Sequence, residues 1–244
     1  MPYGQTGSTL SPQALAALAE FNAEKDGIER RFAELKAKVD EAMAKGSSHD
    51  SDMPVTMDHF MEDWNKSQFW YSDETAKLLA GELLKGATET DTIAILSAPS
   101  VLVAMKNLMS EYEPGRPKPK VVLLEYDQRF AVFPEFVAYD YRHPFKLPAS
   151  LKGSVDRILC DPPFLEEDCQ TKSAMTARWM AKSPGSTDGK VIVCTGERMK
   201  DLVAKVYKSF GVRSTTFEPA HANNLNNEFW CYANFSSEHW DWRN

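Results

Sequence analysis

The 244-residue sequence lacks several features that mark whole classes of protein. No run of residues approaches the roughly 20 consecutive apolar side chains that a transmembrane helix needs. The first ten residues hold neither a basic segment nor an apolar one, so no secretion signal is predicted. Basic residues are outnumbered, at 28 against 35 acidic ones, for a formal charge of −7. Without a membrane span or a secretion signal, we expect a cytoplasmic protein that does not bind membranes. Because most nucleic-acid-binding proteins rely on attraction to phosphates, the negative charge also predicts a protein that does not bind nucleic acids.

Cysteine and histidine are too few and too scattered for a metal centre or a disulfide framework. The four cysteines form no CxxC pair, and the five histidines have no HxxxH or HxH spacing. We therefore expect reduced thiols and no bound metal. The GxGxxG loop of dinucleotide-binding dehydrogenases is also missing, which argues against that class of enzyme.

A long amphipathic helix is predicted near the N-terminus. Ser11 is a natural N-cap, and Pro12 suits the first helical position, where its missing N–H costs no hydrogen bond. Apolar side chains then recur every three or four residues to about Met43, although Gly27 weakens the middle and is a candidate break. This apolar stripe needs a covering surface, either the main domain or a partner. The chain is thus predicted to have three parts, a helical extension at 1–45, a polar linker at 46–60 and a folded domain at 61–244.

The folded domain alternates short apolar runs with helical patterns. Continuous apolar runs of this kind are typical of parallel strands that helices cover on both faces, which is the α/β class. The final two runs have no helix between them and predict an antiparallel hairpin. The expected strands are 92–96, 121–125, 136–139, 155–160, 190–194, 215–218 and 228–234, and the expected helices are 73–84, 100–112, 165–180 and 198–210.

The segment Asp161-Pro162-Pro163-Phe164 follows the fourth predicted strand. In open α/β sheets, ligands bind at the carboxyl ends of the strands. Two prolines fix the backbone and remove N–H groups, so the carboxylate and the nearby carbonyls can accept hydrogen bonds from an amine while the ring holds it in place. Transfer of a group to nitrogen requires such an arrangement. The alternative is a tight turn in which Asp161 caps the next helix.

Carboxylates at two other strand ends suit a nucleoside cofactor. Glu125, with Asp127 as an alternative, lies where an acid would accept both ribose hydroxyls. Asp140 and Tyr141 are placed to bond and flank an adenine ring, or they form a turn.

Two further segments are candidates for the same cofactor pocket. Ser97-Ala98-Pro99 ends the first strand without the usual glycine, and a cofactor that has no pyrophosphate tolerates this loss. The aromatic residues Phe69, Trp70 and Tyr71, which precede the predicted helix N-cap Ser72, either form a pocket wall or belong to the core.

Taken together, these segments resemble one known family, the elongation factor 1A lysine methyltransferase 1 family, once described as putative N6-adenine methyltransferases. The resemblance implies a Rossmann-like seven-stranded methyltransferase sheet, S-adenosylmethionine as cofactor and elongation factor 1A as protein substrate. It covers most of the chain. The matching segments are LSPQALAALAEF (10–21), SQFWYSDETA (67–76), LEYDQRF (124–130), AYDY (138–141), DPPFL (161–165), CTGE (194–197) and NLNNEFWCY (224–232).

The resemblance also implies roles for the candidate residues. Residues 161–164 would hold the acceptor amine, Glu125 and Asp140 the ribose and adenine, 97–100 the methionine moiety, and 69–72 would close over the cofactor. Two departures, the long segment between 21 and 61 and the proline-rich, basic stretch 113–120, affect the surface that would face a partner. The alternatives are an adenine-N6 methyltransferase acting on DNA or RNA and a non-catalytic binding module. We expect a monomer.

Overall fold

The computed structural model describes residues 11–44, 56–62, 68–183, 189–223 and 228–243. The chain divides into two compact units. Of the described residues, the small unit holds 11–44, which include helix α1 (Pro12–Ala44), and 58–61, and the large unit holds 56–57 and those from 62 onward.

Helix α1 is a single helix of 33 residues, so Gly27 does not break it as the sequence suggested. Ser11 caps it as predicted, because its Oγ accepts the N–H of Ala14 at 3.2 Å. The last part of the predicted linker 46–60 is not a simple connection. It contains a short 3-10 helix, Met57–His59, and the ring of Phe60 lies 5.7 Å from that of Phe32 on α1.

The large unit is built on a seven-stranded sheet in the order β3-β2-β1-β4-β5-β7-β6. All pairs from β3 to β5 are parallel, and β7 runs antiparallel to both of its neighbours. The predicted α/β class and the C-terminal antiparallel hairpin are confirmed. The strands are β1 (Thr92–Leu96), β2 (Lys120–Glu125), β3 (Phe136–Ala138), β4 (Arg157–Cys160), β5 (Lys190–Gly196), β6 (Arg213–Ser214) and β7 (Phe229–Ala233).

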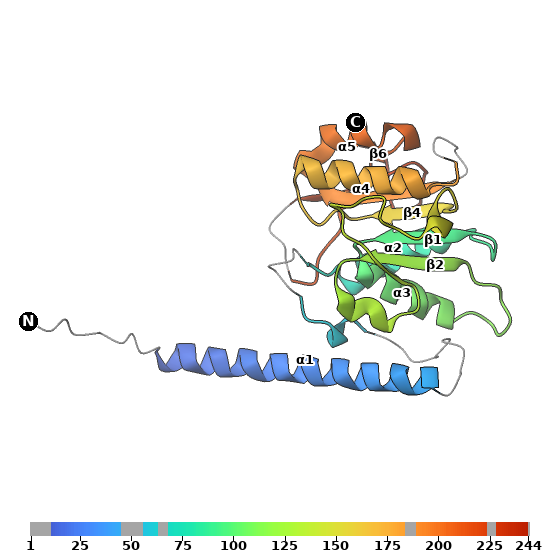
Figure 1. The fold of residues 1–244 in the computed structure, drawn as a ribbon. Coiled ribbons are helices and arrows are strands. Elements are labelled where there is room, and N and C mark those ends of the chain that lie inside the picture. The colour runs from blue at the N-terminus through green and yellow to red at the C-terminus, as the bar shows by residue number, and fades with distance from the viewer. Residues whose placement is uncertain (1–10, 45–55, 63–67, 184–188, 224–227, 244) are drawn as a thin grey trace, which may run out of the picture. The chain divides into compact units, whose positions relative to one another are not determined.

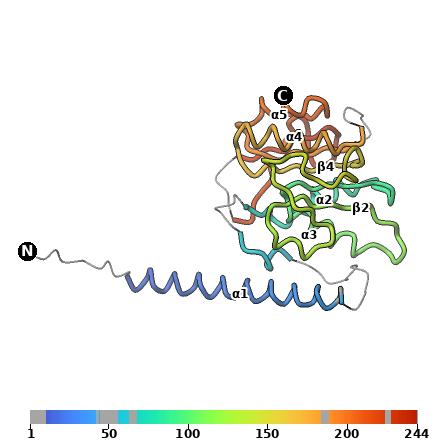
Figure 2. Tube along the Cα trace, in the orientation of Figure 1, coloured from blue at the N-terminus to red at the C-terminus, as the bar shows by residue number. Residues whose placement is uncertain are grey.

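Helices cover both faces of this sheet, which explains the continuous apolar runs of the central strands. Helices α4 (Glu167–Met180) and α5 (Lys200–Val206) lie together on one side of the strands (Figures 1 and 2). Helices α2 (Asp73–Leu84) and α3 (Pro99–Ser110) pack against each other and against β1, β2 and β4. In β1, for example, Ala94 and Leu96 face the α4 side, while Ile93 and Ile95 are buried on the other.

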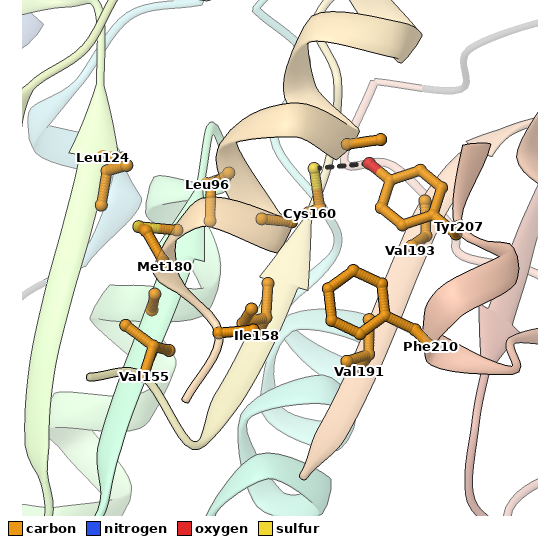
Figure 3. Close-up of a cluster of buried hydrophobic side chains, with 14 of the residues drawn as sticks. Leu96, Leu124, Val155, Ile158, Cys160, Met180, Val191, Val193, Tyr207 and Phe210 are labelled. Carbon is orange, nitrogen blue, oxygen red and sulfur yellow. Dashed lines mark hydrogen bonds between the residues drawn. The ribbon is translucent and has the colours of Figure 1, made fainter. Parts of the chain in front are cut away.

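The core on the α4 side is closed by two aromatic residues that follow α5. Tyr207 and Phe210 pack beside strands β4 and β5, with ring centroids 6.3 Å apart (Figure 3). The hydroxyl of Tyr207 donates to Sγ of Cys160 at 3.1 Å, which satisfies a polar group that would otherwise be buried without a partner. This contact holds the end of β4, and therefore the loop that follows it.

The first strand of the hairpin was predicted at 215–218 and is instead Arg213–Ser214. The reason lies in the residues just before 244. Thr216 donates its N–H to the carbonyl of Asp241 at 2.8 Å, and Thr215 forms an isolated bridge with Trp242. The N–H of Thr215 and the carbonyl of Phe217 still bond to Cys231 of β7, at 2.9 and 3.3 Å, but the bond of Thr216 to Asp241 interrupts the regular ladder after two residues.

Candidate active site

A cavity of about 550 Å³ lies at the carboxyl ends of strands β1 to β4. It brings together residues from four strand ends and from the segment before α2, which are far apart in the sequence. Twelve of the fourteen predicted site residues line it, and Tyr71 and Ser72 do not. The lining residues are Gln68, Phe69, Trp70, Ser97, Ala98, Pro99, Ser100, Glu125, Tyr126, Tyr139, Asp140, Tyr141, Arg142, Asp161, Pro162, Pro163, Phe164, Leu165, Glu166, Arg198, His221 and Phe229.

The Asp-Pro-Pro-Phe loop begins where β4 leaves the sheet. The N–H of Asp161 still bonds to the carbonyl of Leu96 on β1, at 3.0 Å, so the residue is anchored as the last rung of the ladder. Asp161 does not cap the following helix, since α4 begins with Glu166 at the N-cap position. Its Oδ2 instead accepts a hydrogen bond of 2.6 Å from the hydroxyl of Tyr71.

The environment of Asp161 changes its acidity. Burial raises the pKa of its carboxyl, the bond from Tyr71 lowers it and the negative charge of Glu125 raises it, and together these effects place the pKa at about 7. Among the described residues, Oδ1 accepts no hydrogen bond, and the side chain lines the cavity. The site therefore contains a carboxyl group whose charge changes near neutral pH, and such a group can accept a hydrogen bond or a proton from an amine.

Glu125 ends β2 and is only 6% exposed. Its Oε1 accepts the backbone N–H groups of Tyr126 and Asp127, each at 2.9 Å. Burial nevertheless raises the pKa of Glu125 to about 7. Within the described part of the chain Oε2 has no partner, so one oxygen is held by the backbone and the other is available to a ligand.

Asp127, the alternative to Glu125, is engaged elsewhere. Its carboxylate accepts hydrogen bonds from Gln68 at 2.9 Å and from Arg129 at 2.6 Å, and it does not line the cavity. Burial opposes ionisation, but the bonds from Arg129 and Gln68 prevail and lower its pKa. The structure thus favours Glu125 over Asp127 as the residue that faces a ligand.

Asp140 and Tyr141 line the cavity on the β3 side. The guanidinium of Arg142 binds both carboxylate oxygens of Asp140, with Nε at 2.9 Å from Oδ1 and Nη2 at 2.8 Å from Oδ2. Hydrogen bonds from Arg142 lower the pKa of Asp140, which stays ionised. The ring of Tyr141 lies 5.8 Å from that of Phe164, so two aromatic rings from different strand ends meet in the cavity.

The end of β1 explains how the site does without a glycine. Ser97 adopts a φ of +57°, the left-handed region in which glycine is usually found. Its N–H bonds to the carbonyl of Leu124 at 2.9 Å, which holds this conformation in place. Pro99 then starts α3, and residues 97–100 line the cavity. Ser97 carries the strain, of the order of 1–3 kcal/mol for such a residue.

In the aromatic segment before α2, some residues form the pocket wall and others belong to the core, the two roles that the sequence left open. Phe69 and Trp70 line the cavity, and Trp70 also packs edge-on to Phe130 at 5.7 Å. Tyr71 lies behind them, 2% exposed. Ser72 is the N-cap of α2, where its Oγ accepts the N–H of Thr75 at 3.3 Å.

Several lining residues were not predicted from the sequence. His221 and Phe229 come from the region of the terminal hairpin, with ring centroids 4.7 Å apart, and Arg198 follows β5. Burial lowers the pKa of His221 to about 4, so its imidazole is neutral at physiological pH. Only the position of Tyr126, directly after Glu125 at a strand end, gave a usable sequence signal.

Gln170 on α4 links the Asp-Pro-Pro-Phe loop to strand β5. Its Nε2 donates to the carbonyl of Phe164 at 3.0 Å and to Oγ1 of Thr195 on β5 at 2.9 Å, and the residue is fully buried.

We expect Gln170→Leu to destabilise the fold by about 1 kcal/mol, because it removes the donor to Phe164 and Thr195 but also removes the Oε1 atom, which is buried without a partner among the described residues. We also expect it to lower kcat by about tenfold through loosening of the loop. Urea unfolding and steady-state kinetics measure both effects. Unchanged stability together with unchanged kcat would show that the loop does not depend on this side chain.

The described residues contain neither a cluster of metal-ligating side chains nor a membrane-spanning helix. No group of three or more His, Cys, Asp or Glu residues there has the arrangement to hold a metal ion. None of the helices in those ranges combines the length and the apolar character that crossing a bilayer requires.

The strand order, the antiparallel β7 and a cavity that joins Glu125 to the Asp161 loop define the class of seven-stranded methyltransferases. A family profile described as "Probable N6-adenine methyltransferase" matches residues 62–237. The yeast Saccharomyces cerevisiae protein-lysine N-methyltransferase EFM5 is 43% identical over 242 residues, covering 95% of this chain and 94% of that protein. The chain belongs to the family of EEF1A lysine methyltransferase 1 and its relatives, which confirms the resemblance seen in the sequence.

Other comparisons agree with this assignment. Human EEF1A lysine methyltransferase 1 is 36% identical over 230 residues, covering 93% of this chain and 92% of that protein. Among solved structures, a branched-chain polyamine synthase mutein from Thermus thermophilus, in complex with N4-aminopropylspermidine and 5'-methylthioadenosine, aligns with a TM-score of 0.51 and 14% identity. That alignment covers 71% of this chain and 59% of the synthase, and it concerns the fold alone.

Proposed function

We propose that this protein transfers a methyl group from S-adenosylmethionine to a lysine side chain of translation elongation factor 1A. The observation that carries the proposal is that Asp161 and Glu125, from neighbouring parts of one sheet edge, line the same cavity. The names of the relatives support the protein substrate. We further propose that the enzyme acts as a monomer in the cytoplasm and does not use nucleic acid.

The residues at the β2 end of the cavity fit the nucleoside part of S-adenosylmethionine. Hydroxyl groups of a ribose are donors, and Glu125 presents an oxygen that has no partner among the described residues. Tyr126 and Tyr141 supply aromatic surface for an adenine, and Asp140 accepts hydrogen bonds at the same side. When bound, the cofactor supplies an electrophilic methyl group on a positively charged sulfur.

The β4 end fits the lysine. A lysine amine has an ordinary pKa near 10.4 and must lose a proton before it attacks. Transfer into a cavity walled by Phe164, Tyr141 and Phe229 lowers that pKa, because burial disfavours the charged amine. Asp161 and the carbonyl of Pro162 then accept the amine N–H groups and direct the nitrogen lone pair toward the methyl group.

Charge near the acceptor supports the same assignment. His221 is neutral at physiological pH and adds no positive charge that would repel a lysine. Asp161 ionises at about pH 7 and supplies a negative charge where the ammonium group must enter.

The test is to incubate the purified protein with tritiated S-adenosylmethionine and either recombinant elongation factor 1A or total RNA and DNA. Label in the protein that mass spectrometry places on a lysine is the expected result. The "N6-adenine" description of the matching family profile makes nucleic acid the second candidate. Label removed by nuclease would favour that candidate, and failure to bind S-adenosylmethionine in calorimetry would favour a non-catalytic module.

A further inference from the structure

Tyr71 is the only group in the described part of the chain that forms a hydrogen bond with the side chain of Asp161. The two residues are 90 positions apart, yet the Tyr71 hydroxyl lies 2.6 Å from Oδ2. Tyr71 is 2% exposed and does not line the cavity, whereas Asp161 does. The tyrosine therefore contacts the carboxylate from the side opposite to the space that a substrate would fill.

The backbone of Tyr71 is tied down on both sides. The N–H of Ser72 donates to the carbonyl of Ala220, and the N–H of Ala222 donates to the carbonyl of Trp70, each at 2.9 Å. These bonds form a β-bridge between Tyr71 and His221, whose rings lie 5.0 Å apart. The backbone that carries the hydroxyl is thus fixed on both sides, and α2, whose N-cap is Ser72, holds it from the C-terminal side.

We propose that Tyr71 is a positioning residue that holds Oδ2 of Asp161 so that Oδ1 faces the substrate amine. This inference rests on the proposed function, because it assigns Asp161 to the amine. A carboxylate that is free to rotate presents either oxygen in many directions. A single short bond to one oxygen fixes the plane of the group, which is the kind of pre-organisation that aligned transfer requires.

The bond also affects the charge of Asp161. A hydroxyl that donates to a carboxylate stabilises the charged form, so its removal raises the pKa of Asp161 above the value near 7. Few other charges compete at this point. Among the described residues, the titratable groups that face the pair are Glu125, Cys160, Cys194 and His221.

Only Glu125 among these four groups carries a charge near neutral pH. Burial raises the pKa of the Cys160 thiol against the bond from Tyr207, and contact with Cys231 together with burial raises the pKa of the Cys194 thiol, so both stay protonated. Burial keeps His221 neutral. The Tyr71 hydroxyl is consequently the main stabilising contact of the Asp161 anion before substrate enters.

The variant Tyr71→Phe removes the hydroxyl and keeps the ring that packs on His221. We expect the acidic limb of the pH profile of kcat/KM to move upward by about one pH unit. At pH 7 the rate is expected to fall by about tenfold and to recover partly at pH 9. Carbon-13 NMR of the labelled Asp161 carboxyl, without substrate, is expected to report the same upward shift in pKa.

The matched control is Tyr232→Phe on β7. Its hydroxyl is buried and has no hydrogen-bond partner among the described residues, and it does not line the cavity. Its pH profile is expected to match that of the unmodified protein. A uniform loss of rate in Tyr71→Phe with an unmoved acidic limb would overturn the inference.

The two proposals fail in different ways. If the unmodified protein methylates no lysine of elongation factor 1A, the proposed function is wrong. An Asp161 carboxyl pKa that is the same in Tyr71→Phe and in the unmodified protein would instead overturn the role of Tyr71, whatever the substrate.

Discussion

Replacing Asp161 by asparagine is expected to lower kcat by about 100- to 1,000-fold, the loss typical of removing one pre-organised polar group from a reacting centre. Asparagine keeps the size of the side chain but has no negative charge and turns one acceptor into a donor. The amine then loses the group that accepts its proton and fixes its direction. Cofactor affinity is expected to change by no more than a few-fold, because the proposed ribose contact, Glu125, lies at the end of β2.

Single-turnover kinetics and calorimetry with S-adenosylmethionine separate these two effects. The matched control is Asp168→Asn, an acid on the same chain segment that forms an exposed pair with Lys172 and does not line the cavity. It is expected to retain the rate of the unmodified protein. Near-normal turnover in Asp161→Asn with bound cofactor would remove Asp161 from the mechanism.

Glu125→Ala is expected to weaken cofactor binding by about 10- to 100-fold. Hydrogen bonds to a charged group contribute about 1.5–3 kcal/mol, and the variant loses such bonds to the ribose. It also leaves the N–H groups of Tyr126 and Asp127 without their present acceptor. The increase in Kd is measured by calorimetry at constant pH.

The affinity of the unmodified protein is expected to depend on pH. The pKa of Glu125 is raised to about 7, and a hydroxyl donor binds the charged form better, so affinity should fall as the pH is lowered below about 7. Asp161 titrates in the same range, but its share of the dependence is expected to be no more than the few-fold change in affinity given for Asp161→Asn. In Glu125→Gln, the affinity for the cofactor should depend less steeply on pH, because the glutamine side chain does not ionise. A profile of the same steepness in both proteins would contradict the assignment of Glu125 to the ribose.

Much of the fold was predictable because its strands are buried on both faces. Runs such as 93–96 and 121–124 are continuously apolar, and their length and spacing indicate a parallel sheet. The prediction for strand β6 was wrong because the strand has only two residues. The residues that follow it, Thr215 and Thr216, pair with residues about 25 positions later in the chain. No local pattern reports such a competition between distant segments.

Some residues of the candidate site were likewise predictable from the sequence, and others were not. The acids and the Asp-Pro-Pro-Phe loop were identifiable because parallel strands bring their carboxyl ends to one edge, so the position of a residue after a strand is informative. The partners of those residues were not. The bond between Tyr71 and Asp161 and the placement of His221 depend on how a loop after β6 folds back onto the start of α2. Their sequence neighbours carry no periodicity that would reveal it.

The insertion of β7 between β5 and β6 has a consequence for biosynthesis. As the chain emerges from the ribosome, β1 to β5 can pair with one another, but the outer edge of β5 has no strand beside it until residues 229–233 are made. The short β6 is synthesised earlier yet pairs only with β7, so it cannot shield that edge. An unpaired apolar edge promotes aggregation. The nascent protein therefore passes through a stage in which the edge of β5 is unpaired, and Phe229, the first residue of β7, reaches the cavity only when that stage ends.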